Sequence, residues 1–201
     1  MAQAPDIRPA AGRRRRADAE RSVARILDAA VDALASDPEA SMAEIARRAG
    51  VVRATIYVHF PTREALIAAV TEHAISHVAD IVTAAEPDVG EPVEALARLI
   101  GTTWQTMGRY HALVALNAGL PQAQLHAKHR PVLAQLEPLI ARGQREGAFR
   151  ADVEPAWHLA MILALIHAAS GALETGHGSE AEIGAALVAT VLGAVGAAAT
   201  A

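Results

Sequence analysis

The sequence predicts an all-α protein, and three observations support this fold class. Aromatic residues are only 3% of the chain, so the core must consist of Ala, Leu, Val and Ile, which favours closely packed helices. Apolar residues recur at helical spacing in most segments, and no alternating run argues convincingly for a strand. Clusters of proline and glycine separate these segments. We expect a small N-terminal three-helix domain followed by a larger helical domain.

The N-terminal segment, residues 1–17, is rich in Pro, Ala and Arg, and this composition predicts a disordered basic arm. Its cluster Arg13–Arg16 could reach phosphates or a minor groove, or could act only as a solvated tail that aids non-specific attraction. The first helix is predicted over residues 18–35, and Ser36-Asp37-Pro38 ends it. Its apolar stripe comprises Val23, Ile26, Leu27, Ala30, Val31 and Leu34.

The next two helices are predicted to be short. Ser41 and Glu44 have the spacing of a capping box, in which the hydroxyl accepts from an orphan amide and the carboxylate reaches back. Gly50 ends the first helix in a left-handed turn, and Ile56 and Phe60 form the apolar stripe of the second. A helix this short must be held by its neighbours, as in a helix-turn-helix.

A fourth helix is predicted over residues 63–85, with Thr62 as its cap and Glu64 in its first turn. This helix is shared between two domains, which we place at residues 18–66 and 67–201. Further helices are predicted at residues 92–110, about 112–118, 122–146, 155–172 and 181–198. The helix at 122–146 contains Pro131 and Pro138, so it is expected to be kinked or split.

The stretch between Ser41 and Val70 resembles the DNA-binding domain of the tetracycline-repressor (TetR) family of transcription regulators. The matching residues are Ser41, Ile45, Ala46, Ala49-Gly50-Val51, Thr55-Ile56-Tyr57, His59-Phe60 and Arg63-Glu64-Ala65-Leu66. The resemblance is close from Arg21 to Val70, and beyond it the chain matches in length and helical pattern. Val52 departs from the family, which often has Ser or Thr there to cap the recognition helix.

This resemblance implies a set of DNA contacts. Arg53 opens the recognition helix, where a guanidinium can bind guanine O6 and N7 in a bidentate fork. Ala54 and Val58 offer methyl surface to a thymine methyl group. Carried over by motif position, the phosphate and groove contacts are Thr55, Tyr57, His59 and Arg63, with Ser41 and Thr62 at helix N-termini. Tyr57 and His59 have an alternative role in half-buried packing.

The charge distribution is consistent with DNA as a partner, although the net charge is −4. Residues 1–63 hold eleven basic and eight acidic residues, whereas residues 64–201 hold seven and fourteen. A basic front half on an acidic body would direct nucleic acid to the N-terminal domain, although chance asymmetry is an alternative.

The resemblance implies that the last two helices form a homodimer interface. A two-fold dimer on a palindromic site doubles the contacts with DNA. Two stripes are predicted there: Trp157, Met161, Leu165 and Ala168, and Ile183, Leu187, Val191 and Ala194, with Gly193 allowing close approach. For any one of these residues, a place in the core of the single chain is the alternative.

The resemblance also implies an effector pocket in the second domain. Candidate lining residues are Trp104, Met107, His111, Asn117, Met161 and His167. The sparse polar set indicates a hydrophobic effector, although Trp and Met at helical spacing are also typical of an ordinary core.

Other classes of function lack support in the sequence. His73 and His77, and His126 and His129, have chelating spacing, but no cysteine or evident carboxylate set accompanies them, so surface histidines and no metal are expected. No phosphate loop, nucleotide-binding glycine pattern or nucleophile elbow occurs, so neither a cofactor nor an enzyme is predicted.

The expected location is the cytoplasm, since the chain has no cysteine and no secretory signal pattern. Residues 183–201 are uncharged and long enough to span a bilayer. Their Ala, Gly and Thr content and missing basic flanks predict a packing helix instead, with no membrane partner.

These observations together predict a homodimeric repressor of a palindromic operator, released by a small hydrophobic ligand. A ligand-independent DNA-binding or architectural protein is one alternative. An enzyme with an appended helix-turn-helix is the other, and no catalytic constellation in the sequence favours it.

Overall fold

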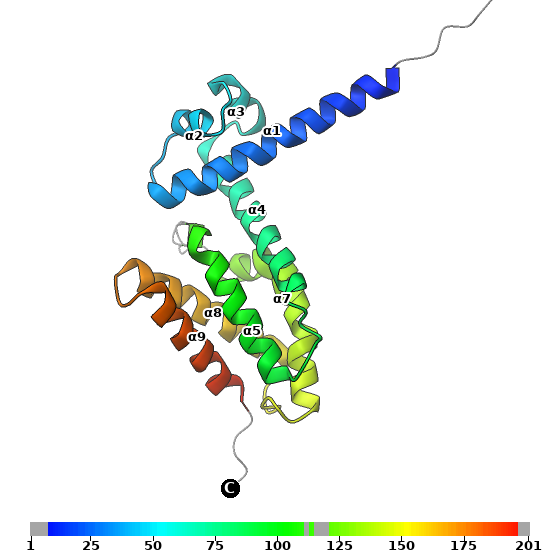
Figure 1. Ribbon diagram of the computed structural model, residues 1–201, viewed down its shortest axis with the longest axis vertical. Coiled ribbons are helices and arrows are strands. Elements are labelled where there is room, and N and C mark those ends of the chain that lie inside the picture. Colours follow the sequence, from blue (N-terminus) through cyan, green and yellow to red (C-terminus); the bar gives the residue numbers. More distant parts are fainter. Residues whose placement is uncertain (1–7, 111–112, 115–120, 197–201) are drawn as a thin grey trace, which may run out of the picture. The chain divides into compact units, whose positions relative to one another are not determined.

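The computed structural model describes residues 8–110, 113–114 and 121–196, and these form an all-helical structure (Figure 1). The contacts divide the chain into two compact units, of which the first ends at Val70 and the second begins at Thr71. The predicted all-α fold class is confirmed. The predicted residues His111 and Asn117, and most of the short helix expected at 112–118, lie outside the described residues.

The first unit consists of α1 (Arg8–Ser36), α2 (Met42–Arg48), α3 (Arg53–His59) and the start of α4 (Arg63–Ala84). Helix α1 packs against α2, and α2 packs against α3. Each helix places one apolar stripe in a shared core, whose fully buried side chains include Ile26, Leu34, Ile45, Ile56 and Leu66. The seven-residue helix α3 is therefore held in place by its neighbours, since a helix of two turns has little stability alone.

Helix α1 begins at Arg8, so the prediction that residues 8–17 are disordered is wrong. Arg and Ala are among the strongest helix formers, and Pro9 falls in the first turn, where its missing amide has no intrahelical partner to lose. The Pro-, Ala- and Arg-rich composition did not predict this helix, although residues 10–17 are Ala or Arg at every position except Gly12 and both residue types favour a helix.

The second unit contains the rest of α4, α5 (Pro92–Met107), the 3₁₀ turn η1 (Gly108–Tyr110), α7 (Gln122–Arg145), α8 (Pro155–Glu174) and α9 (Glu180–Val195). Helix α5 packs against α7 and α9, and α8 packs against α7 and α9. Figure 1 shows these helices side by side along much of their length. Their common core includes Leu96, Leu99, Leu139, Ile140 and Ile162, each almost fully buried.

Helix α7 is a single helix that contains Pro131 and Pro138, so the split that was one of the two expected outcomes does not occur. The two prolines are seven residues apart, and both are exposed. The carbonyls that they leave without an amide belong to Ala127 and Ala134, which are exposed as well. Water can satisfy these carbonyls, so the loss of two helical hydrogen bonds does not end the helix.

The predicted interface stripe on α9 is largely wrong, because Ile183, Leu187 and Val191 are buried in the core of the unit. The opposite face of α9 is exposed and consists of small residues. Since α9 is apolar on every side, helical periodicity could not identify the face that is turned inward.

Two helices of the described chain, α4 and α8, are long and apolar enough to cross a membrane by length and composition alone. Core helices of globular proteins pass the same test, and Val82 of α4 and Ile162 of α8 belong to the core. Only 28% of the apolar window of α8 is buried, against 39% for α4. Helix α8 therefore keeps an extensive apolar surface that the described part of the chain leaves exposed.

Candidate functional site

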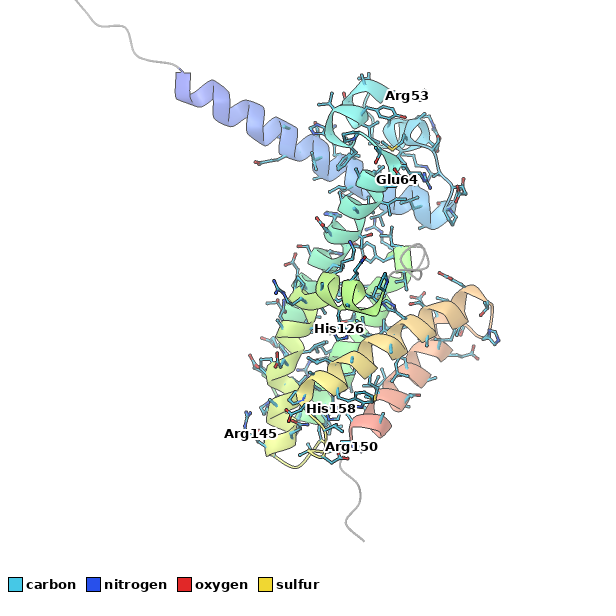
Figure 2. The ribbon with its side chains drawn as sticks, turned by 180° about the vertical axis from the view of Figure 1, so that it is seen from behind. Arg53, Glu64, His126, Arg145, Arg150 and His158 are labelled. Atoms are coloured by element: carbon cyan, nitrogen blue, oxygen red, sulfur yellow. The ribbon has the colours of Figure 1, made fainter. Side chains whose placement is uncertain are left out.

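The exposed face of α3 is the first candidate site. Val52, Arg53, Ala54, Tyr57 and Val58 are exposed, and the exposed fractions of Val52 and Val58 are as high as 71% and 77%. Figure 2 shows Arg53 at the start of this helix. A solvent-facing surface with two valines and a tyrosine is unusual unless it meets a partner.

The other predicted contact residues of α3 are less accessible. Thr55 and His59 are half-buried, and the His59 ring lies 6.3 Å from that of Phe60, between centroids. Val52 makes no capping hydrogen bond to the helix, as its side chain predicts. The first amides of α3 are therefore not satisfied by a side-chain cap.

Arg53 and Tyr57 are paired along α3. The Arg53 guanidinium carbon lies 5.5 Å from the centroid of the Tyr57 ring, and Nη2 donates to the Tyr57 hydroxyl at 3.4 Å. Both residues line an open hollow with Ser41 and Arg63, so four of the predicted contact residues meet there. The contact between the guanidinium and the ring restricts the rotamers of Arg53 and so orients it.

The turn before α3 follows from local chemistry. Gly50 has a φ of +66°, and the Val51 amide donates to the Ala46 carbonyl at 3.0 Å, which closes the end of α2. At the start of α2, the Ser41 hydroxyl accepts from the Glu44 amide at 3.2 Å. The Glu44 carboxylate does not complete the predicted capping box, because it accepts hydrogen bonds from Arg47 and Arg48 instead. These bonds lower the pKa of Glu44 to about 2.

Arg63 and Thr62 hold the start of α4. The Arg63 guanidinium donates to the carbonyls of Pro38 and Ala40, which fixes the loop between α1 and α2. The Thr62 hydroxyl accepts from the Ala65 amide at 3.1 Å, and Glu64 lies in the first turn, so the predicted cap is confirmed. The Arg63 guanidinium therefore binds carbonyls of its own chain, whereas the sequence predicted it as a contact to DNA.

The second candidate site is a cavity of about 90 Å³ in the second unit. Helices α4, α5, α7 and α8 form its walls together with Tyr110 of η1, Leu113 and Val114. The aliphatic and methionine residues in the lining are Ala74, Ile75, Val78, Met107, Leu113, Val114, Leu125, Val132, Leu133, Leu136, Ile162, Leu163 and Ile166. The remaining lining residues are Thr71, Thr103, Tyr110, Lys128, His129 and His167.

Two histidines from different helices meet at this cavity. The ring centroids of His129 on α7 and His167 on α8 lie 5.5 Å apart, with their planes at 67°. Burial lowers the pKa of both rings. Positive charge on His126 and Lys128 lowers the pKa of His129 further, and positive charge on His129 lowers that of His167. Burial therefore disfavours the protonated form of both imidazoles.

The predicted effector residues divide in the structure. Met107 and His167 line the cavity. Trp104 does not, because its indole packs against Gly184 of α9 and donates to the Glu180 carbonyl at 2.9 Å. Met161 packs beside the core and does not line the cavity either.

Sequence reasoning missed His129, which was expected on the surface, and Thr103. The three-residue spacing from His126 drew attention to metal binding, whereas the signal in His129 was its place on the face that carries Leu125, Val132 and Leu136. In the described part of the chain, no group of three His, Cys, Asp or Glu residues could hold a metal ion.

Both units match models of known protein families. Residues 26–70 match the model of bacterial regulatory proteins of the tetR family, and residues 92–175 match that of the tetracyclin repressor-like C-terminal domain. The helix-turn-helix-type transcriptional regulator NfxB of Pseudomonas aeruginosa is 28% identical over 148 residues, which are 71% of this chain and 78% of NfxB.

Two solved structures extend the similarity along the chain. The TetR transcription regulatory protein from Mycobacterium vanbaalenii is 31% identical, with a TM-score of 0.61 and coverage of 90% of this chain and 98% of that one. The TetR-like regulator LfrR from Mycobacterium smegmatis, solved in complex with proflavine, is 24% identical with a TM-score of 0.69. That match covers 88% of this chain and 97% of LfrR.

Proposed function

Because this chain belongs to the TetR family of DNA-binding transcriptional regulators, which are not enzymes, we propose that it is a homodimeric repressor of a palindromic operator. A small apolar molecule in the cavity of the second unit releases it from DNA. The repressor acts in the cytoplasm, where its operator is accessible.

The observation that carries this proposal is the exposed, uncapped α3 with Arg53 at its start. Arg53, Ala54 and Val58 would read base edges in the major groove, and Tyr57 would bind a phosphate through its hydroxyl. Ser41 and Thr62 begin α2 and α4, where backbone amides and the helix dipole favour a phosphate. We assign Thr55 and His59 to the edge of the contact, and Arg63 to positioning the loop beside it.

The homodimer is proposed to form through α8 and α9. Between Pro155 and Leu173, and between Ile183 and Val195, the chain has no Lys, Arg, Asp or Glu. The exposed residues of these segments include Trp157, whose exposed fraction is 64%, and a series of small residues: Ala156, Ala164, Ala168, Ala185, Ala186, Ala189, Thr190 and Gly193. Exposed helix faces without charge are typical of an interface with a second copy.

The cavity is proposed to be the effector site. Pockets for drug-sized ligands enclose roughly 300–1,000 Å³, so such a ligand would need the walls of the present cavity of about 90 Å³ to move apart. Thr71, Ile75 and Val78 of α4 belong to those walls, and α4 begins at Arg63 in the DNA-binding unit. A ligand that displaces α4 would favour one arrangement of the two DNA-binding units of the dimer over another. In the relative LfrR, proflavine is the bound molecule.

Selection of bound sequences from random duplex DNA tests the repressor proposal. Purified protein should enrich an inverted repeat whose half-sites are about one helical turn apart, since a two-fold dimer presents α3 twice. Enrichment of a single half-site would contradict the dimer, and no enrichment at low salt would contradict the DNA-binding role of α3. An architectural protein would instead bind without sequence preference.

A further inference from the structure

We infer that the effector is an apolar carboxylic acid whose carboxylate binds at the part of the cavity formed by Lys128, His129 and His167. This inference rests on the proposed effector role of the cavity, and it adds the chemical class of the molecule. Four observations carry it: the apolar walls, the sign of the charge at the cavity, the two facing imidazoles and a buried hydroxyl without a partner.

The walls define the bulk of the ligand. Most of the described lining residues are aliphatic or Met, and they come from four helices that surround the cavity. Such walls offer dispersion contacts and no hydrogen bonds, so the body of the ligand must be hydrocarbon or aromatic.

The charges at the cavity define the sign of the ligand's head group. Lys128 is the one charged residue in the described lining, and no Asp or Glu of the described chain lines the cavity. A cationic ligand would therefore find no countercharge and would face an ammonium group, whereas a carboxylate would gain an ion pair.

The histidine pair adds a hydrogen-bonding site. His129 Nδ1 donates to the Leu125 carbonyl at 2.8 Å, so in the neutral ring the proton is on Nδ1 and Nε2 is an acceptor. The titratable groups that act on the pair are His126 and Lys128 on α7, and both disfavour a second positive charge. On the other walls, the Tyr110 hydroxyl is hydrogen-bonded to Nδ1 of His77 on α4, at a distance of 2.7 Å. No carboxylate of the described chain lines the cavity beside the histidine pair.

An anionic head group would supply the negative charge that is needed to stabilise a protonated histidine in the pair. With a carboxylate beside His129, protonation of Nε2 converts that atom from an acceptor to a donor, and the imidazolium is stabilised by the ligand. Binding of the acid is therefore expected to be coupled to the uptake of a proton from solvent.

Thr103 provides independent support. Its side chain lines the cavity from α5, its exposed fraction is 5%, and Oγ1 has no hydrogen-bond partner in the described part of the chain. A buried hydroxyl without a partner is uncommon in folded proteins, and a ligand oxygen would satisfy it.

A matched set of probes tests the head group: octanoate, 1-octanol and octylamine share one hydrocarbon chain. Calorimetric titration of the full chain at pH 7 should show octanoate binding at least about tenfold more tightly than octylamine, a difference of about 1.4 kcal/mol. Titrations in two buffers with different ionisation enthalpies should show proton uptake with octanoate and none with octanol. Equal or tighter binding of octylamine overturns the inference, as does failure of octanoate to bind at millimolar concentration.

Variants locate the head group. Lys128→Met and His129→Gln should each reduce the preference for octanoate over octanol, and His129→Gln should also abolish proton uptake. Arg145→Met, at the exposed end of the same helix, is the control and should change neither quantity. Unchanged preference in both cavity variants overturns the inference. The selection of DNA sequences uses protein without ligand, so it tests the repressor proposal independently of the ligand titrations that test this inference.

Discussion

At the scale of single residues, the Arg53–Tyr57 pair predicts which side chain recognises a base. The ring of Tyr57 orients the Arg53 guanidinium at the start of α3, where a side chain can reach a base edge. Arg53→Ala should remove the preference at one base position in each half-site, a loss of ~1–3 kcal/mol of discrimination. The measurement is a comparison of binding logos with wild type. Arg145→Ala, in the other unit, should leave the logo unchanged, and an unchanged logo for Arg53→Ala would refute its role.

Tyr57→Phe separates the hydroxyl from the ring. The phenyl group keeps the cation–π contact with Arg53, whereas the hydrogen bond at 3.4 Å and any phosphate contact are lost. Affinity should therefore fall by a similar factor for all sequences, with the logo preserved. Titration of a panel of single-base operator variants measures this. A loss confined to one base position would show that Tyr57 reads sequence.

The buried histidines predict a pH dependence of stability. The pKa of His129 lies below the usual 6.5 because burial disfavours the imidazolium, so below pH 6.5 the unfolded chain binds more protons than the folded chain. Stability should therefore be highest above this pH and should fall as the pH decreases. Urea unfolding at pH 5 and pH 7.5 should show a smaller difference for His129→Gln than for wild type. His177→Gln, in an exposed turn, should behave as wild type.

At the scale of elements, the sequence specified the first unit better than the second. The Ser41 cap, the Gly50 turn and the Ile56–Phe60 stripe act over one or two helical turns, so local chemistry alone predicts them. In α9 the apolar residues surround the helix, and only packing against α5 and α8 decides which face is buried. Long-range contacts of this kind also removed Trp104 from the predicted cavity and placed His129 in it.

The contact between α5 and α9 can be tested through one glycine. A Cβ at Gly184 would lie 2.4 Å from Cδ1 of Trp104, so the indole fits only because α9 has no side chain there. Gly184→Ala should destabilise the fold by about 1–3 kcal/mol, as measured by the denaturation midpoint. At Gly101 of α5, an added Cβ meets no atom within 4 Å. The control Gly101→Ala should therefore be neutral or stabilising by up to ~1 kcal/mol, and equal midpoints for both variants would contradict this packing.

At the scale of the whole molecule, the uncharged faces of α8 and α9 predict the oligomeric state. Deletion of these helices cannot test the interface, because Ile162 and Leu187 belong to the core, and the shortened chain would lose its fold. A charge placed on the exposed face leaves the core intact. Ala189 of α9 is exposed, and Ala134 on the exposed face of α7 provides a matched position outside the proposed interface.

Ala189→Glu should therefore convert the dimer to a monomer. In a two-fold interface each carboxylate is buried without a partner, at a cost of several kcal/mol per ion, so the dissociation constant should rise by at least about a hundredfold. Sedimentation velocity measures this, and Ala134→Glu should remain dimeric. The monomer should retain affinity for an isolated half-site, because α3 lies in the other unit, but lose its preference for the inverted repeat. A dimeric Ala189→Glu variant would place the interface on another surface.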